Sequence, residues 1–294
     1  MTVEPALPPT VDSLAALDGR YDGLIVDLWG TVHNGVALFP GVADALAAAR
    51  AAGKRVILLT NAPRRAAPVA EGLLRFGLAT GHYDAVLTAG EVAWHALATR
   101  SDPWHAALGT RAYHIGPARD LSLMEGNGLT RTTDVGVGDF VLVSGPFDDS
   151  MTLADHEPAL AACLARKLKL VSANPDREVI RGETRLVCAG AIAECYAEMG
   201  GEIRQHGKPY RSIYDEALAL LDLPAARVLA IGDGLPTDIA GAAGASIDTA
   251  FIPGGIHGAA MGIAMGGLPT AAAYRAVAAA HAARPTWMIP ALRW

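Results

Sequence analysis

The feature that most constrains the fold is a set of short aliphatic runs that each end in a small or polar residue. Three of these runs are Leu24–Val26, which meets Asp27, Val56–Leu59, which meets Thr60, and Val228–Ile231, which meets Gly232-Asp233. Continuous apolar runs of this length are typical of strands buried on both faces of a parallel sheet. In such sheets ligands bind outside the carboxyl ends of the strands, so the polar residues at these ends are the first candidates for a functional site.

Between these runs, apolar residues recur at helical spacing. The first such segment carries Val42, Leu46 and Ala49 and ends before Gly53. Further helices are expected at 66–76, 91–100, 239–243 and about 270–283. Ile213, Ala217 and Leu220 mark the apolar face of one more helix. Further strands are expected at 84–88 and 249–252. Strands that alternate with helices in this way predict an α/β fold with a doubly wound, Rossmann-like parallel sheet.

The pattern changes after Ser101-Asp102-Pro103. Here we expect strands at 112–115, 140–143 and 168–171 and helices at 155–166 and 191–199. We therefore interpret 103–205 as a smaller α/β domain that is inserted into a core domain formed by 1–102 and 206–294. The sequence also predicts a short helix at 11–17, a glycine-rich loop at 253–268 without GxGxxG spacing, and an aromatic segment at 285–290 that packs on the core.

Composition narrows the classes of function. The 294 residues carry a net charge of −6 without an extended Lys/Arg cluster, so we expect no nucleic-acid partner. The apolar runs stay below the roughly 18 residues of a membrane span, and the Pro-rich N-terminus does not resemble a signal peptide. The three cysteines form no CxxC pair, which favours buried thiols in a reducing compartment. We therefore expect a cytoplasmic protein without a membrane partner.

Four strand-end motifs follow one another along the chain: Asp27-Leu28-Trp29-Gly30-Thr31, Thr60-Asn61, Gly207-Lys208-Pro209, and Gly232-Asp233 with Asp238. This set resembles the four motifs of the haloacid dehalogenase-like (HAD) hydrolase superfamily, and the resemblance covers the whole chain. The inserted segment is similar to the cap domain of the class IIA, NagD-like branch, which holds sugar, pyridoxal and phosphoglycolate phosphatases. Ser172–Asp176 and Ala189–Ile192 lie in the cap as they do in that branch.

The resemblance implies a Mg²⁺ site. A phosphate monoester is a dianion that repels an attacking carboxylate, and a divalent cation held by oxygen ligands removes that repulsion. The ligands implied by the family are the Asp27 carboxylate, the Trp29 backbone carbonyl, Asp233 and Asp238. A structural role remains open for two of these side chains, since Asp27 could cap its turn and Asp238 could serve as an acid near a helix N-terminus.

The resemblance also assigns the covalent step. Asp27 is implied as the nucleophile that forms an aspartyl-phosphate. Thr60, Asn61 and Lys208 are implied to contact the phosphoryl group, and the Lys208 ammonium supplies a positive charge. Taken singly, Thr60 could also be a strand-end cap and Lys208 a surface lysine.

Trp29 departs from the family pattern. Phosphatases of this superfamily carry a second aspartate at that position, which protonates the leaving group and then activates water. An indole has no proton that titrates near neutral pH, and loss of general acid–base catalysis typically costs about 10²–10⁴-fold in rate. His33 is the nearest candidate for a replacement donor, although a histidine in this loop could also simply pack.

Three interpretations of this departure remain open. The protein is a Mg²⁺-dependent phosphohydrolase with slow or atypical acid–base chemistry, a binding protein that holds a phosphorylated ligand without turnover, or a hydrolase of the 2-haloacid dehalogenase type. Dehalogenases of the superfamily carry an aromatic residue at this position but need no Mg²⁺, so retention of the Asp233/Asp238 pair argues against the third. Trp29 itself could stack on a substrate ring or fill space.

The cap is expected to set the substrate, which the family implies is a small, sugar-phosphate-like metabolite. An inserted domain of this kind closes over the core and contributes specificity loops. Asn174 and Asp176 are the candidates for substrate contact, and the alternative is a plain Asn-Pro-Asp turn. Members of the branch often dimerise through the cap, so the resemblance also leaves a homodimer open.

Overall fold

The computed structural model describes residues 6–181 and 184–294. The chain divides into two compact units. The first takes in the residues up to Thr60, Ala70–Leu87 and Tyr214–Trp294, and the second takes in Asn61–Val69 and Thr88–Ile213. Three segments of the second unit, 61–69, 88–102 and 206–213, were assigned to the core from the sequence. The predicted boundaries of the inserted domain, 103 and 205, therefore stay a prediction.

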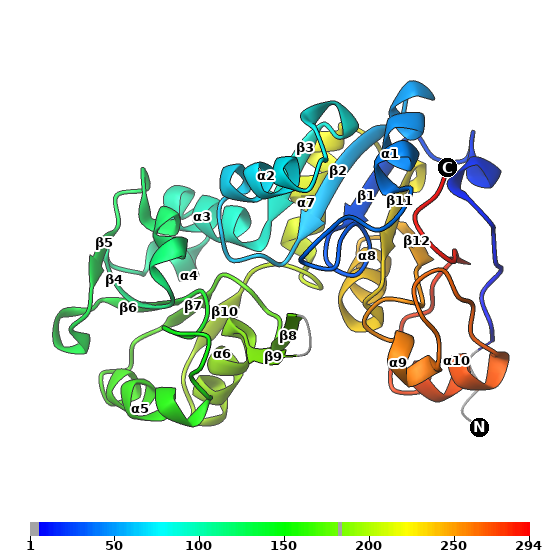
Figure 1. Ribbon diagram of the computed structural model, residues 1–294. Helices are drawn as coiled ribbons and strands as arrows, with labels where there is room; N and C mark the ends of the chain where they lie inside the picture. The colour runs from blue at the N-terminus through cyan, green and yellow to red at the C-terminus, as the bar shows by residue number, and fades with distance from the viewer. Residues whose placement is uncertain (1–5, 182–183) are drawn as a thin grey trace. The chain divides into compact units, whose positions relative to one another are not determined.

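The first unit is built on a six-stranded sheet (Figure 1). Its strands stand in the order β13 (Trp287–Met288), β12 (Asp248–Phe251), β11 (Val228–Gly232), β1 (Gly23–Asp27), β2 (Arg55–Thr60) and β3 (Ala85–Thr88). The pairs from β13 through β2 are parallel. The two halves of the sheet run outward from β1 and β11, which is the doubly wound order predicted from the sequence.

The register of the central strands sets the position of the predicted site. Val26 pairs with Ile231, and Asp27 pairs with Leu59. β1 and β11 are buried along their whole length, as their unbroken apolar runs predicted. Asp27 and the residues that follow β11 therefore share one edge of the sheet, at the point where the strand order reverses.

The helices follow the strands in the predicted alternation. They are α1 (Val42–Ala51), α2 (Ala66–Arg75), α7 (Arg211–Leu221), α8 (Ala240–Gly244), α9 (Gly258–Met261) and α10 (Ala271–Ala278). Two expectations need correction. The buried face of α7 carries Ile213, Tyr214, Ala217 and Leu221. Tyr214 and Leu221 place the centre of this face away from Leu220, which is exposed. The loop expected at 253–268 contains the short helix α9.

The ends of the chain complete the first sheet. β13 pairs with β12, and Met288 exchanges backbone hydrogen bonds with Pro9 and Val11. The expected packing of the aromatic tail on the core is confirmed, since Met288 is buried and the Trp287 indole donates to the Tyr21 hydroxyl at 2.9 Å. The helix expected at 11–17 is only a 3₁₀ turn, Leu14–Leu17, because Val11 is engaged along β13.

The second unit has its own parallel sheet. The strand order is β10 (Ile203–Gln205), β7 (Leu170–Ser172), β6 (Phe140–Val143), β4 (Arg111–Ile115) and β5 (Thr130–Thr132). Its helices are α3 (Ala89–Thr99), α4 (Pro103–Ala106), α5 (Glu157–Ala165) and α6 (Ala189–Glu198), and β8 (Glu178–Arg181) pairs antiparallel with β9 (Thr184–Val187). The short strands β5 and β10 were not predicted, because three-residue edge strands with few apolar residues carry no periodic signal.

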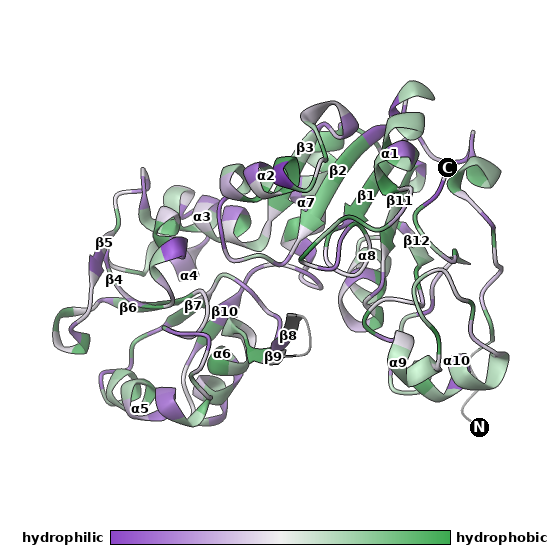
Figure 2. Ribbon diagram, in the orientation of Figure 1, coloured by the Kyte–Doolittle hydropathy of each residue, from purple (hydrophilic) through white to green (hydrophobic). Residues whose placement is uncertain are grey.

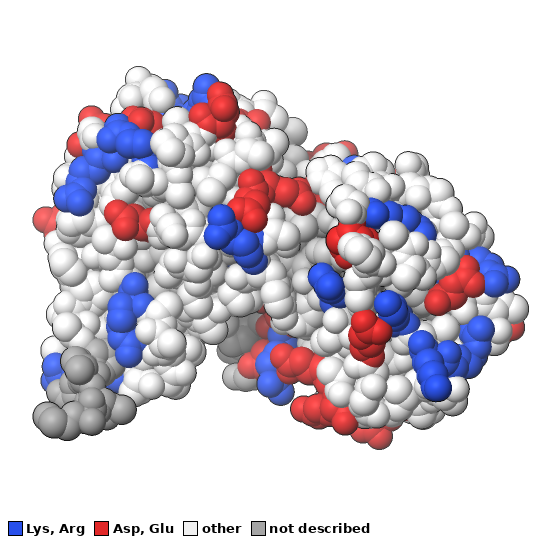
Figure 3. Space-filling model, turned by 180° about the vertical axis from the view of Figure 1, so that it is seen from behind, with Lys and Arg blue, Asp and Glu red and all other residues white. Residues whose placement is uncertain are grey.

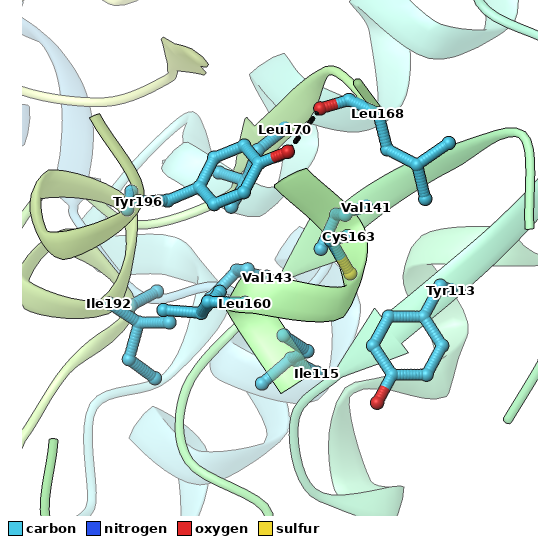
Figure 4. Close-up of a cluster of buried hydrophobic side chains, with 12 residues drawn as sticks. Tyr113, Ile115, Val141, Val143, Leu160, Cys163, Leu168, Leu170, Ile192 and Tyr196 are labelled. Carbon is cyan, nitrogen blue, oxygen red and sulfur yellow. Dashed lines mark hydrogen bonds between the residues drawn. The ribbon is translucent and has the colours of Figure 1, made fainter. Parts of the chain in front are cut away.

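Apolar side chains cover both faces of this second sheet. Successive residues of β6 alternate between two clusters: Val141 and Val143 pack in one, and Phe140 and Leu142 in the other. Figure 4 shows the first cluster, in which the hydroxyl of Tyr196 donates to the Leu168 carbonyl at 2.6 Å. In Figure 2 the short edge strand β5 is purple, whereas the central strands β1 and β2 of the first sheet lie at the hydrophobic end of the scale. Burial on both faces explains why these strands read as continuous apolar runs.

The described residues give little support to a cysteine nucleophile or to a membrane-spanning helix. All three cysteines are free thiols, and burial raises the pKa of Cys163 to about 11, which disfavours the nucleophilic thiolate. None of the described helices is long and apolar enough to cross a bilayer. On the face seen in Figure 3, basic and acidic side chains are interspersed.

A buried polar pair lies at the carboxyl ends of β4 and β6. His114 Nε2 is 3.0 Å from the Ser144 hydroxyl, and both side chains are almost inaccessible to solvent. Burial lowers the pKa of His114 from 6.5 to about 4, with a smaller contribution from Arg131. The folded protein therefore prefers the neutral imidazole.

We expect this histidine to make folding sensitive to acid. A lowered folded-state pKa gives stability that is complete above pH 6.5 and is lost as the pH falls toward 4. The loss amounts to about 3 kcal/mol, at about 1.4 kcal/mol for each pKa unit. Urea unfolding from about pH 7 to about pH 4.5 should therefore show a shallower loss of stability for His114→Gln than for the wild type. The exposed His95→Gln variant is the control, and parallel curves for all three proteins would contradict the assignment.

Candidate active site

Three aspartates converge at the switch point of the first sheet. Asp27 ends β1, Asp233 follows β11, and Asp238 lies in the helical turn Leu235–Ile239. Carboxylate oxygens of all three lie within 4.8 Å of one another, and each residue is only 5% exposed. Among the described residues, this is the one group of His, Cys, Asp or Glu with the geometry of a metal site.

The turn after β11 brings Asp238 back toward Asp233. The backbone N–H of Gly234 donates to Asp238 Oδ2 at 3.0 Å. Glycine is required at position 232, because a Cβ there would lie 2.2 Å from the Asp238 carboxyl carbon. The hydroxyl of Tyr214 donates to the Asp238 backbone carbonyl at 3.2 Å, which holds the turn from its other side.

Glycines also surround Asp233. Gly30 has φ +85°, and a Cβ on it would lie 1.9 Å from Asp233 Oδ2. A Cβ on Gly255 would lie 2.1 Å from the same oxygen, and the neighbouring Ile256 N–H donates to it at 2.6 Å. The glycine-rich segment that the sequence suggested was only a loop therefore forms part of the wall of the site. No sequence signal marked it, because only the fold brings the end of β12 beside β11.

Trp29 packs against its own loop. A Cβ on Gly35 would lie 2.4 Å from the indole, and the ring stands edge-on to His33 with centroids 5.4 Å apart. His33 packs in turn against Phe76 at 5.3 Å. Trp29 nevertheless remains 36% exposed. The indole thus fills the space over the Gly35 turn and still leaves surface for contact with a ligand.

His33 has the contacts of a packed residue. Its Nδ1 accepts a hydrogen bond from the Gly35 N–H at 3.0 Å, so this nitrogen carries no proton. Burial lowers its pKa to about 4, which keeps the ring neutral at physiological pH. A neutral imidazole is a weak proton donor, so these contacts favour the packing role over the donor role.

Thr60 lies at the same sheet edge as Asp27. It is the last residue of β2, directly after Leu59, which pairs with Asp27, and it is buried. The remaining predicted site residues, Asn61, Asn174, Asp176 and Lys208, belong to the second unit. The roles predicted for all of these residues stay predictions.

The second unit brings Asn61 and Lys208 together. Lys208 N–H donates to Asn61 Oδ1 at 2.7 Å, and Asn61 Nδ2 donates to the Lys208 carbonyl at 3.0 Å. Asn61 Nδ2 also donates to Asp176 Oδ1 at 2.8 Å. Both amide hydrogens of Asn61 are therefore used within the protein. Asn174 Oδ1 accepts from the Asp176 N–H, so the Asn-Pro-Asp segment forms the turn that was the alternative to substrate binding.

Two histidines anchor the chain just before Lys208. His206 Nε2 lies 3.2 Å from His105 Nε2, and His105 Nδ1 contacts the Asp102 carboxylate. Burial, with smaller contributions from His105 and Arg204, lowers the pKa of His206 to about 3. No pattern in the sequence marks this histidine pair, because a contact between residues 101 positions apart along the chain has no local signal.

The chemistry of the aspartate cluster fits a hard divalent cation. Magnesium prefers oxygen ligands, and a cation would relieve the repulsion among three carboxylates that share a buried site. In the part of the chain that the structure describes, no thiolate or imidazole joins the cluster. Such a donor set favours magnesium or calcium over the softer transition metals.

Comparisons with known proteins place the chain in a family. Its residues 24–130 match the family described as haloacid dehalogenase-like hydrolase, and residues 205–274 match the family described as HAD-hydrolase-like. The crystal structure of a haloacid dehalogenase-like hydrolase from Brucella suis 1330 is 34% identical, with a TM-score of 0.81 over 96% of this chain and 99% of that one. The protein belongs to the haloacid dehalogenase-like hydrolases.

Two further comparisons concern a mycobacterial enzyme. The D-glycerol 3-phosphate phosphatase of Mycobacterium tuberculosis is 31% identical over 82% of this chain, which spans 65% of the length of that relative. The crystal structure of glycerol phosphate phosphatase Rv1692 from Mycobacterium tuberculosis in complex with magnesium is 25% identical, with a TM-score of 0.64 over 81% of this chain and 69% of that one. The predicted superfamily, fold and hydrolase class are confirmed by these comparisons.

The contact between Gly30 and Asp233 can be tested with a matched pair of variants. Gly30 and Gly41 have similar φ, +85° and +81°, but a Cβ on Gly41 would meet nothing within 4 Å. Alanine at either position costs roughly 1–2 kcal/mol for the left-handed backbone. We expect only Gly30→Ala to weaken Mg²⁺ binding in calorimetric titrations, because only its methyl group displaces Asp233. Equal loss of Mg²⁺ affinity in both variants would assign the effect to backbone strain instead.

Proposed function

We propose that this protein is a Mg²⁺-dependent phosphohydrolase that acts on a small, sugar-phosphate-like metabolite through an aspartyl-phosphate on Asp27. The observation that carries the proposal is the cluster of three buried carboxylates at the switch point of the first sheet. The magnesium complex and the glycerol phosphate substrate named for the mycobacterial relatives support it.

The cation would be held by Asp27, Asp233 and Asp238 together with the backbone carbonyl of Trp29. When bound, Mg²⁺ supplies positive charge that offsets the carboxylates and the phosphate dianion and polarises a phosphoryl oxygen. Three carboxylates in one buried site are otherwise costly, since like charges at this separation repel strongly in a low-dielectric environment. The proposed cation accounts for why the fold holds them together.

The chain's own residues perform the covalent steps. An Asp27 oxygen attacks phosphorus, the bond between phosphorus and the ester oxygen breaks, and the leaving oxygen takes up a proton from solvent, because Trp29 cannot supply one. Water then attacks the phosphorus of the aspartyl-phosphate and gives up a proton to solvent, which releases phosphate and restores the carboxylate. Thr60 and Asn61 are proposed to contact the phosphoryl oxygens, and Lys208 is proposed to offset their charge. To donate to a phosphoryl oxygen, Asn61 would have to give up one of its present hydrogen bonds, to Asp176 or to the Lys208 carbonyl.

Trp29 gives the proposed enzyme an unusual leaving-group preference. The side chain in the position of the family's acid cannot protonate an alkoxide. Esters whose leaving groups are already acidic, such as aryl phosphates, need little protonation and are proposed to react faster than sugar phosphates. The exposed part of the indole offers a surface on which a ring of the leaving group could stack.

The nucleophile is tested first. Mg²⁺-dependent release of phosphate from p-nitrophenyl phosphate and a panel of metabolite phosphates should be lost with EDTA and in Asp27→Asn, and acid-quenched wild type should carry one phosphoryl group on the peptide containing Asp27. Asp44→Asn, an exposed change on α1, is the control. Unchanged turnover in Asp27→Asn would reject the nucleophile.

The other two interpretations give different results in the same assay. Mg²⁺-dependent thermal stabilisation by a phosphorylated compound, without release of phosphate, would indicate a binding protein. Release of halide from 2-haloacids in EDTA would indicate a dehalogenase.

The role of Trp29 is tested by restoring the acid. We expect Trp29→Asp to raise turnover of alkyl phosphates by up to about 10²–10⁴-fold, and turnover of p-nitrophenyl phosphate by much less, because only the alkoxide needs a proton. Trp29→Asn removes the indole without adding an acid and should give no such gain. An equal gain in both variants would mean that the indole blocks the site sterically, and no gain in a variant that still binds Mg²⁺ would mean that the pocket serves another chemistry.

A further inference from the structure

The segment between β12 and α9, residues 252–257, contacts both Asp233 and the start of the turn that carries Asp238. Ile256 N–H donates to Asp233 Oδ2 at 2.6 Å. The next residue, His257, uses its Nε2 to accept a hydrogen bond from the Leu235 N–H at 3.2 Å. Leu235 begins the turn Leu235–Ile239 that carries Asp238. One short loop therefore contacts Asp233 directly and holds the first residue of the turn that presents Asp238.

The hydrogen bond defines the state of the His257 ring. A backbone N–H can only donate, so Nε2 must be an unprotonated acceptor. The neutral ring then carries its proton on Nδ1. A side chain without an acceptor at this position would leave the buried Leu235 N–H without this hydrogen bond, which is unfavourable for a buried donor.

The position of the ring is itself determined by packing. The His257 ring lies 6.1 Å from Phe251 on β12 and 5.6 Å from His281, which it meets edge-on. The Gly258 N–H donates to the Gly255 carbonyl at 2.9 Å, which closes the loop into a tight turn. The Gly255 site leaves no room for a Cβ, so the loop approaches Asp233 as closely as a backbone can.

We infer that His257 is a positioning residue for the metal centre. It holds the amino end of the Leu235–Ile239 turn, so that Asp238 is presented beside an Asp233 whose own oxygen is held by Ile256. Asp233 and Asp238, which both follow β11, are thus held in place by the loop that follows the neighbouring strand β12. The inference rests on the proposed function, since it concerns the Mg²⁺ site of that reaction. Partners of this kind orient ligands, and their loss typically costs about 10–100-fold in metal affinity.

The test compares two substitutions of the same residue by Mg²⁺ titration calorimetry. His257→Leu keeps apolar bulk but removes the acceptor, and we expect Mg²⁺ to bind about 10–100-fold more weakly. His257→Gln places an amide oxygen near the position of Nε2 and should recover most of the affinity. In a phosphate-release assay, the Mg²⁺ concentration for half-activation should rise in the leucine variant, while kcat at saturating Mg²⁺ stays close to that of the wild type.

His281→Leu is the matched control, because it removes one of the two rings against which His257 packs and leaves the hydrogen bond to Leu235. We expect its Mg²⁺ affinity to stay near the wild-type value. An equal loss in His281→Leu, or a loss in His257→Leu that glutamine does not recover, would assign the effect to packing and overturn the inference.

A second variant keeps the test decisive if His257→Leu does not fold. Gly255→Ala should weaken Mg²⁺ binding through the same loop, because its Cβ would lie 2.1 Å from Asp233 Oδ2. Unchanged affinity in that variant would overturn the bracing role of the loop. A wild-type protein that binds no Mg²⁺ would reject the proposed function together with the inference, whereas Mg²⁺ binding unchanged by these substitutions would reject the inference alone.

Discussion

Mutual repulsion of three buried carboxylates is the constraint on which the rest of the first unit depends. Asp27, Asp233 and Asp238 come from two strand ends and a turn, and they cannot share one buried site unless the surrounding backbone holds them there. The structure does this with close approaches that only glycine permits. Gly30 and Gly255 face Asp233, and Gly232 faces Asp238. The cation that we propose would turn this repulsion into attraction.

The second unit also contains a buried charged residue, Lys208. Lys208 is almost fully buried, and its backbone is held on both sides by the amide of Asn61, which is itself held by Asp176. These hydrogen bonds fix the backbone of Lys208, and therefore the point from which its side chain extends. Asn61 and Asp176, which were predicted to contact substrate, thus hydrogen-bond to each other, and Asn61 links the segment after β2 to the segment after β10.

The sequence predicted the central strands and the edge strand β3 well, and the other edge strands poorly. β1, β2, β11 and β6 are buried on both faces, so each reads as an unbroken apolar run. The edge strands β10 and β13 have only two or three residues, not all of them buried, and what makes them strands is their pairing with β7 and β12. Leu220 was misplaced on α7 because the sequence pattern did not include Tyr214, whose burial together with Leu221 shifts the apolar face away from Leu220.

The sequence by itself determined the class of fold, the order of the four motifs and the absence of an acid at Trp29, because these depend on residue identity and on local periodicity. Only the tertiary structure decided which groups support them. The loop of Ile256 and His257 meets Asp233 and Leu235 because β12 lies next to β11, and His105 meets His206 across 101 positions of chain. Contacts between segments far apart in sequence leave no periodic trace, since any backbone N–H or imidazole can make them once the sheet has set the distances.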